Sequence, residues 1–213
     1  MERLLPLFPL EVVLLPEEPL PLHIFEERYK IMIGECLAAK AAGEGQQEFG
    51  VVLAKGQELS AVGCAAHIVN LTRKYEDGRM DILTVGKRRF EIIETNEERA
   101  YLQGAVDFFD DDGLDTPPDT EAIMAIERFQ EVMKKLRQDP EMPVHLPPPY
   151  RYLSFRMAAA LPLDLEFKQQ LLTLRSEPER LELVLRAMDA IFHQLDRLRE
   201  AQAKSGGNGN VHH

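Results

Sequence analysis

This sequence has few of the features that mark disulfide-rich, membrane-spanning or nucleic-acid-binding proteins. It has only two cysteines, Cys36 and Cys64, without C-x-x-C spacing or the number that a disulfide framework needs. It has no uninterrupted apolar run of the ~20 residues that span a membrane, because Glu11, Glu17 and Glu18 break the apolar N-terminal stretch. Basic residues are outnumbered, with 25 lysines and arginines against 36 aspartates and glutamates and a formal net charge of -11. We therefore expect two buried thiols in a reducing cytoplasm, no membrane segment, and a surface that disfavours nucleic acid.

Motifs for catalysis and for cofactor binding are also missing. There is no G-x-x-x-x-G-K-[ST] loop to bind nucleotide phosphates, which excludes ATP hydrolysis by these residues. None of the serines lies in a G-x-S-x-G turn or beside a motif that would activate its hydroxyl: Ser60, Ser154, Ser176 and Ser205. His23, His67 and His145 lie on separate expected elements without H-x-x-x-H spacing, so we interpret them as strand and loop residues and not as zinc ligands. The sequence predicts no catalytic residue, no cofactor and no metal.

What is present suits a folded protein with its own core. At 213 residues the chain can form one large or two small domains and bury roughly 70% of its unfolded surface. Hydrophobic residues make up 45% and charged residues 29%, which is typical of globular proteins.

The stretch from Leu4 to Ile33 predicts two strands followed by a helix. Three short apolar runs are separated by prolines, which lack an amide donor and are confined to turns and strand edges: Pro6, Pro9, Pro16, Pro19 and Pro21. The proline-free part carries apolar residues at helical spacing from Phe25, which predicts a helix over 25–40.

The remainder of the first half predicts antiparallel strands. Asp77-Gly78 supplies the positive φ of a tight hairpin turn, and Gly86-Lys87 separates two further short runs. About six strands are expected in the first half without intervening long helices, which favours a closed or nearly closed barrel because closure hides unpaired edges. The expected strands are 49–54, 62–73, 80–85, 88–93 and 101–108.

The second half predicts helices. An acidic stretch over 110–119 with Gly113, Pro117 and Pro118 indicates a linker, and apolar residues then recur at helical spacing. Asp164 is placed to cap one helix, and Ser176 with Glu179 forms a capping box for the last one. The expected domains are a β-rich barrel with one helix at 1–109, the linker at 110–119, a helical subdomain at 120–204 and a disordered tail at 205–213.

Several of these pieces, in this order, resemble the N-terminal domain of Lon proteases. They are L-P-L-F-P-L, P-L-P-L-H-I-F-E-E-R-Y, V-G-C-A-A-H-I, D-G-R, V-G-K-R-R-F, Y-L-Q-G-A-V, A-A-A-L-P-L-D-L-E-F-K-Q-Q-L-L and E-R-L-E-L-V-L. The resemblance covers nearly all of residues 4–198 and implies an α+β fold, a PUA-like antiparallel pseudo-barrel followed by a C-terminal helical bundle. It also implies a role in recognising protein substrates or partners and not in chemistry. A similar domain also occurs alone in bacteria.

Two sets of residues are candidates for binding, and for each an ordinary structural role stays open. Aromatic residues and one methionine near turns suit an apolar peptide segment in a groove between barrel and helical lobe, unless they belong to the core: Tyr75, Met80, Phe108, Phe109, Tyr150 and Tyr152. Basic residues near the Asp77-Gly78 hairpin suit RNA, unless neighbouring acidic residues balance them: Arg73, Lys74, Lys87, Arg88 and Arg89. The sequence thus favours a non-enzymatic module that binds unfolded or exposed apolar protein segments, with RNA binding or docking on a separate ATPase or protease as alternatives.

Overall fold

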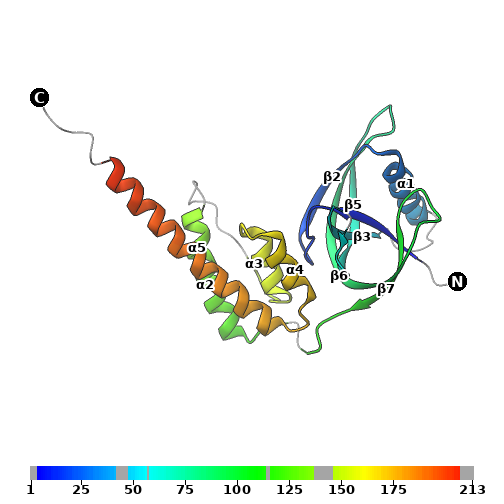
Figure 1. Cartoon of the computed structure of the whole chain (residues 1–213). Helices are drawn as coiled ribbons and strands as arrows, with labels where there is room; N and C mark the ends of the chain where they lie inside the picture. Colours follow the sequence, from blue (N-terminus) through cyan, green and yellow to red (C-terminus); the bar gives the residue numbers. More distant parts are fainter. Residues whose placement is uncertain (1–3, 42–47, 57, 114–115, 137–145, 207–213) are drawn as a thin grey trace, which may run out of the picture. The chain divides into compact units, whose positions relative to one another are not determined.

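The chain forms two compact units in the computed structural model, which describes residues 4–41, 48–56, 58–113, 116–136 and 146–206. We call them the barrel unit, residues 1–113 with 158–175, and the helical unit, residues 114–157 with 176–213. The elements of the barrel unit are labelled in Figure 1: β1 (Leu5–Leu10), β2 (Pro19–Ile24), α1 (Glu27–Ala41), β3 (Glu48–Lys55), β4 (Glu58–Leu59), β5 (Val62–Lys74), β6 (Met80–Asn96), β7 (Gln103–Phe109) and α4 (Leu165–Thr173).

The strands of the barrel unit close on themselves. They follow the order β1-β7-β6-β5-β3-β4, and β1 also pairs with β3, which joins the two sides of the sheet (Figure 1). β2 lies off this path and pairs with β6. The α+β class and the predicted barrel are confirmed, with two differences: β1 and β3 run parallel, and the two-residue β4 is an additional strand.

Each proline of β1 lies at a position where β1 pairs with only one neighbouring strand. Pro6 lies opposite Gln103 of β7, whereas the register with β3 begins only at Leu7. Pro9 lies opposite Val52 of β3, beyond the end of the pairing with β7. Because proline cannot donate to a ladder, this change of partner in the middle of β1 lets a proline-rich strand lie inside a closed barrel.

β6 is one long strand, not the two short strands expected on either side of Gly86. It pairs with β2, β5 and β7, and Gly86 is buried within it. A Cβ at Gly86 would lie 2.2 Å from the carbonyl oxygen of Leu15, and Gly86 exchanges backbone hydrogen bonds with Glu17 and Glu18. The glycine therefore permits the close approach of the segment before β2 and does not mark a turn.

The barrel interior is filled around Phe90. Its ring reaches the backbones of two neighbouring strands, so that an ideal Cβ at Gly50 or at Gly63 would lie 2.5 Å from its Cζ atom. Leu7 and Val52 pack into the same buried cluster. The missing side chains of the two glycines leave the space that this aromatic ring occupies.

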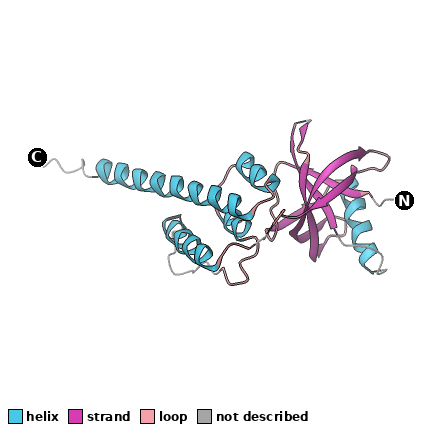
Figure 2. Ribbon diagram, turned by 90° about the horizontal axis from the view of Figure 1, so that it is seen from below, coloured by secondary structure: helices cyan, strands magenta, loops and turns pink. Residues whose placement is uncertain are grey.

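The first helix begins later than predicted. α1 starts at Glu27 and lies beside the strands, as Figure 2 also shows. Its buried face carries Tyr29, Met32 and Ile33, as its spacing predicts. Phe25, which the prediction places in the helix, lies before it with 60% of its surface exposed.

The segment 158–175 belongs to the barrel unit, although the sequence places it in the helical subdomain. In α4, Gln169 donates a hydrogen bond from Nε2 to the carbonyl oxygen of Val62 (3.0 Å), and Lys168 forms an ion pair with Glu18 (2.9 Å). The predicted cap is confirmed, since Asp164 accepts a hydrogen bond from the amide of Phe167. Polar contacts with the barrel, which apolar periodicity does not record, thus hold α4 to the strands.

Asp111, which the sequence places in the acidic linker, is buried in an ion pair with Arg89. The side chains of Arg89 and Asp111 are 2% and 1% exposed and lie 2.6 Å apart. Arg89 also donates to the carbonyl oxygens of Leu172 and Leu174 at the end of α4. Asp111 is therefore a structural residue of the barrel unit and not a solvated linker residue.

The helical unit contains α2 (Asp119–Leu136), α5 (Glu177–Gly206) and most of α3 (Leu153–Ala160). α2 and α5 pack against each other, and the predicted start of α5 is confirmed because Ser176 Oγ accepts from the amide of Glu179. α5 extends two residues into the predicted tail, of which residues 207–213 lie outside the described part. No described helix combines the length and apolar character that crossing a membrane requires.

Candidate functional site

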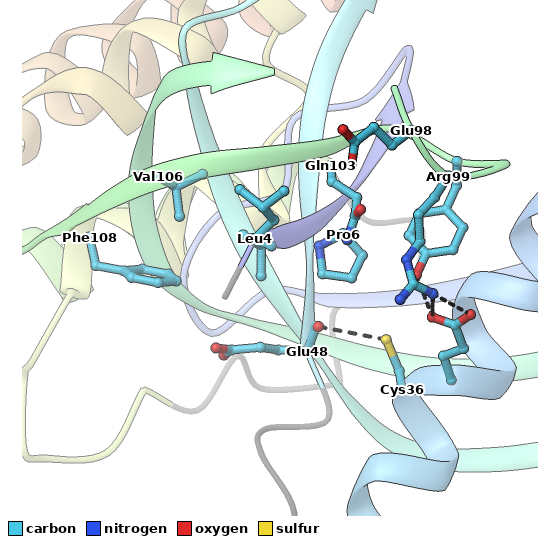
Figure 3. Close-up of a pocket in the computed structure, with 12 residues that line it drawn as sticks. Leu4, Pro6, Cys36, Glu48, Glu98, Arg99, Gln103, Val106 and Phe108 are labelled. Carbon is cyan, nitrogen blue, oxygen red and sulfur yellow. Dashed lines mark hydrogen bonds and ion pairs between the residues drawn. The ribbon is translucent and has the colours of Figure 1, made fainter. Parts of the chain in front are cut away.

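A cavity of about 670 Å³ opens in the barrel unit. Its walls come from the residue before β1 and from β1, α1, β3, the loop between β6 and β7, and β7 (Figure 3). This volume is within the range of roughly 300–1,000 Å³ that is typical of ligand-binding clefts. The lining residues are Leu4, Leu5, Pro6, Glu35, Cys36, Glu48, Glu98, Arg99, Tyr101, Gln103, Val106 and Phe108.

One side of the cavity is apolar. Leu4, Pro6, Val106 and Phe108 gather there in Figure 3. Val106 and Phe108 point the same way because alternate residues of a strand share a face, and Phe108 is 38% exposed. Its ring lies edge-on to that of Phe90, with 6.1 Å between the centroids. The barrel core thus supports an aromatic side chain that is still accessible from the cavity.

Acidic residues also line the cavity, and two of them are paired with arginine. Arg99 forms an ion pair with Glu35 of α1 (2.7 Å), and both side chains are about half exposed. Arg88 forms an ion pair with Glu48 (2.8 Å), and its guanidinium lies 3.8 Å from the centre of the Phe108 ring. The cavity therefore combines an apolar wall with fixed charges at its rim, which suits an amphipathic occupant.

Tyr101 holds the Glu35 carboxylate of the cavity wall in position. Its hydroxyl donates to Glu35 Oε2 over 2.5 Å, and the residue is 3% exposed. Burial, together with the hydrogen bond to Glu35, raises the pKa of Tyr101 to about 12. The phenol therefore stays a donor at neutral pH and holds the Glu35 carboxylate in place.

The two cysteines are buried, as predicted. Burial raises the pKa of the Cys64 thiol to about 12, so this thiol is not a nucleophile at neutral pH. Cys36 lies in the cavity wall and contacts the carbonyl oxygen of Glu48 through its sulfur at 3.7 Å.

Among the residues expected to bind peptide, only Phe108 lines this cavity. Phe109 faces elsewhere, because the guanidinium groups of Arg89 and Arg175 lie 4.7 and 4.2 Å from its ring centre. Tyr150 and Tyr152 belong to the helical unit, where Tyr152 is 9% exposed and packs on Phe155. The expected groove between barrel and helical lobe stays a prediction.

The hairpin residues form a separate cluster. The guanidinium groups of Arg73 and Arg79 lie 4.5 and 4.9 Å from the centre of the Tyr75 ring. Its hydroxyl donates to Asp81 (2.8 Å), which also contacts His23. Met80 is buried, so of the two hairpin residues expected to bind peptide only Tyr75 reaches the surface.

The basic residues expected to contact RNA are divided by the structure. Arg89 is buried, and Lys87 and Arg88 form ion pairs with Glu17 and Glu48. Arg73 and Lys74 are exposed near the hairpin. The five cations therefore do not form one accessible patch.

Sequence reasoning missed most of the cavity. The sequence indicates strand positions for Leu4 and Pro6 and gives no signal for Glu35, Glu98 and Arg99, because their convergence depends on barrel closure. It does single out Phe108, as an aromatic residue near a turn that suits an apolar peptide. The pattern of residues within one element cannot reveal a cavity whose walls come from several elements.

The profile of the ATP-dependent protease La (Lon) substrate-binding domain matches residues 4–190. Lon protease of Cytophaga hutchinsonii is 24% identical over 215 residues, which cover 94% of this chain and 26% of that protein. Lon protease 1 of Hydrogenovibrio crunogenus is 29% identical over 142 residues, which cover 65% of this chain and 17% of that protein. The chain thus spans about a quarter or less of the length of these relatives.

Solved structures give the same result for the fold. The Lon N-terminal domain protein from Xanthomonas campestris aligns with a TM-score of 0.63 and 26% identity, covering 86% of this chain and 97% of that one. The N-terminal domain of a Mycobacterium avium complex Lon protease aligns with a TM-score of 0.61 and 16% identity, covering 88% and 98%. The second likeness concerns the fold alone.

Proposed function

Because the chain belongs to the family of ATP-dependent protease La (Lon) substrate-binding domains, we propose that it binds exposed apolar segments of other proteins and performs no chemistry on them. The observation that carries this proposal is the cavity of the barrel unit, with its apolar wall of Leu4, Pro6, Val106 and Phe108. An accessible aromatic residue in a concave, largely apolar site is a common anchor for a bound segment.

The environment of Ser154 supports a non-catalytic function. Ser154 lies in the helical unit and is fully buried. Its hydroxyl donates to Glu177 Oε2 (2.7 Å) and accepts from Arg180 Nε (3.2 Å). A hydroxyl in this position cannot reach a peptide bond, so we assign it a structural role.

RNA binding is the weaker candidate. Arg89 is buried, Lys87 and Arg88 are paired with acids, and the formal net charge of the chain is -11. The negative net charge repels a phosphate backbone, and the buried or paired basic residues are not available to bind one. We therefore keep protein segments as the proposed ligand; docking on a separate ATPase or protease would be compatible with the same cavity.

Binding of a fluorescently labelled apolar peptide, followed by anisotropy, tests the proposal. Phe108→Ala should weaken binding by about five- to thirtyfold, since loss of an aromatic anchor commonly costs 1–2 kcal/mol. Phe25→Ala is the matched control, because Phe25 is exposed and outside the cavity, and it should leave affinity unchanged. Absence of binding at ~100 μM, or equal weakening by both variants, would contradict the proposal.

A further inference from the structure

We propose that the cavity of the barrel unit selects apolar segments that carry a basic side chain, with Glu98 as the carboxylate that receives it. This inference rests on the proposed function and adds the charge of the ligand to it. The assignment of this role to Glu98 starts from the ion pairs that the other charged residues of the cavity wall already form.

The first step concerns the charges of the cavity wall. The lining residues include three glutamates, Glu35, Glu48 and Glu98, and a single arginine, Arg99. Arg99 pairs with Glu35, and Arg88 from outside the lining pairs with Glu48. Within the described part of the chain, the Glu98 carboxylate has no ion-pair partner, which leaves one negative charge at the rim uncompensated.

The second step concerns how this cavity holds cations. Arg88 places its guanidinium against both the Glu48 carboxylate and the face of the Phe108 ring. Arg99 makes the corresponding contact with Glu35, whose other partner is the Tyr101 hydroxyl. The side chain of Glu48 is only 11% exposed, so its negative charge acts in a poorly hydrated environment. Carboxylates beside aromatic rings favour cations through both Coulomb and cation–π attraction.

The third step combines the apolar wall with these charges. An occupant that places an apolar side chain against Leu4, Val106 and Phe108 lies within the cavity whose rim includes Glu98. A lysine or arginine that the same occupant directs toward Glu98 is attracted by it, whereas an aspartate or glutamate there is repelled. The net charge of the whole chain acts in the same direction.

Three peptides with one apolar anchor test this inference, flanked by lysine and arginine, by serine, or by aspartate and glutamate. We expect the basic peptide to bind about five- to tenfold tighter than the neutral one at low salt, and the acidic one to bind most weakly. Added salt should reduce these differences, because exposed charges are screened. Glu98→Gln should bring the basic peptide toward the neutral affinity, while the matched control Glu76→Gln, an exposed glutamate on the hairpin turn, should not.

The outcomes separate this inference from the proposed function. Equal binding of all three peptides, still weakened by Phe108→Ala, would overturn the charge preference and leave the proposed function intact. Tighter binding of the acidic peptide, or equal effects of Glu98→Gln and Glu76→Gln, would also overturn it. If none of the peptides binds, the proposed function itself fails.

Discussion

At the scale of single residues, Gly86 shows how an apparent breaker shapes the barrel. Read from the sequence, Gly86-Lys87 separates two strands, because glycine disfavours the interior of a strand. In the structure the same absence of a side chain lets the Leu15 carbonyl approach the middle of β6. The sequence pattern indicates that a glycine is needed at position 86. It cannot distinguish a turn from a close approach of another segment, because both require the absence of a Cβ.

Gly86→Ala should destabilise the protein. Its Cβ would meet backbone atoms of Leu15, which cannot move as a side-chain end can, so we expect a loss of about 1–3 kcal/mol in the free energy of unfolding. Gly34→Ala is the control: it lies in α1 with open space around its Cβ position and should stabilise by about 0.5–1 kcal/mol. Chemical denaturation measures both, and an unchanged midpoint for Gly86→Ala would contradict this packing.

Tyr101 supplies a prediction about pH. Burial first, and the bond to Glu35 second, raise its pKa from 10.0 to about 12 in the folded protein. The unfolded chain therefore loses this proton first, so the stability that Tyr101 contributes is complete below pH 10 and declines as the pH rises toward 12. The unfolding free energy of the wild type, relative to Tyr101→Phe, should fall over this range. A difference that stays constant from pH 9 to 12, or a Tyr101 ionisation near 10 in an ultraviolet titration, would be the contrary result.

At the scale of elements, patterns between residues near in sequence predicted more than polar contacts between distant residues did. The barrel strands, the start of α5 and the cap of α4 follow from alternation, helical spacing and capping residues. The assignment of α4 to the barrel unit does not, because Gln169, Lys168 and Arg89 carry it through hydrogen bonds and ion pairs to distant positions. A single sequence does not show which distant polar residues pair with each other. The sequence alone therefore places Asp111 in the linker.

Arg89→Met should therefore weaken the barrel unit strongly. It removes the cation of the buried Arg89–Asp111 ion pair and the donors to the end of α4, which together should cost about 3–5 kcal/mol. Lys87→Met, on the same strand, removes an exposed ion pair with Glu17 and should cost at most ~1 kcal/mol. Thermal and urea unfolding distinguish the two; similar small losses would show that the buried pair is not needed for stability.

At the scale of the whole molecule, family membership and the cavity support the same proposed function by separate routes. The family concerns nearly the entire chain, whereas the cavity belongs to the barrel unit alone. The fold class could be predicted from strand order and from the resemblance. The lining could not, because Leu4, Glu35, Glu98 and Phe108 are far apart in sequence and meet only when β1 closes the barrel with β3 and β7.

Photo-cross-linking tests the central claim most directly. An apolar peptide with a benzophenone side chain at its anchor position would be bound to the full chain, irradiated, and the attachment sites read by mass spectrometry. We predict attachment within residues 4–6 and 106–108, the two stretches that contain the apolar wall, and loss of attachment in Phe108→Ala but not in Phe25→Ala. Attachment confined to the hairpin at 73–80, or to Tyr150, Tyr152 and α5, would contradict binding in this cavity.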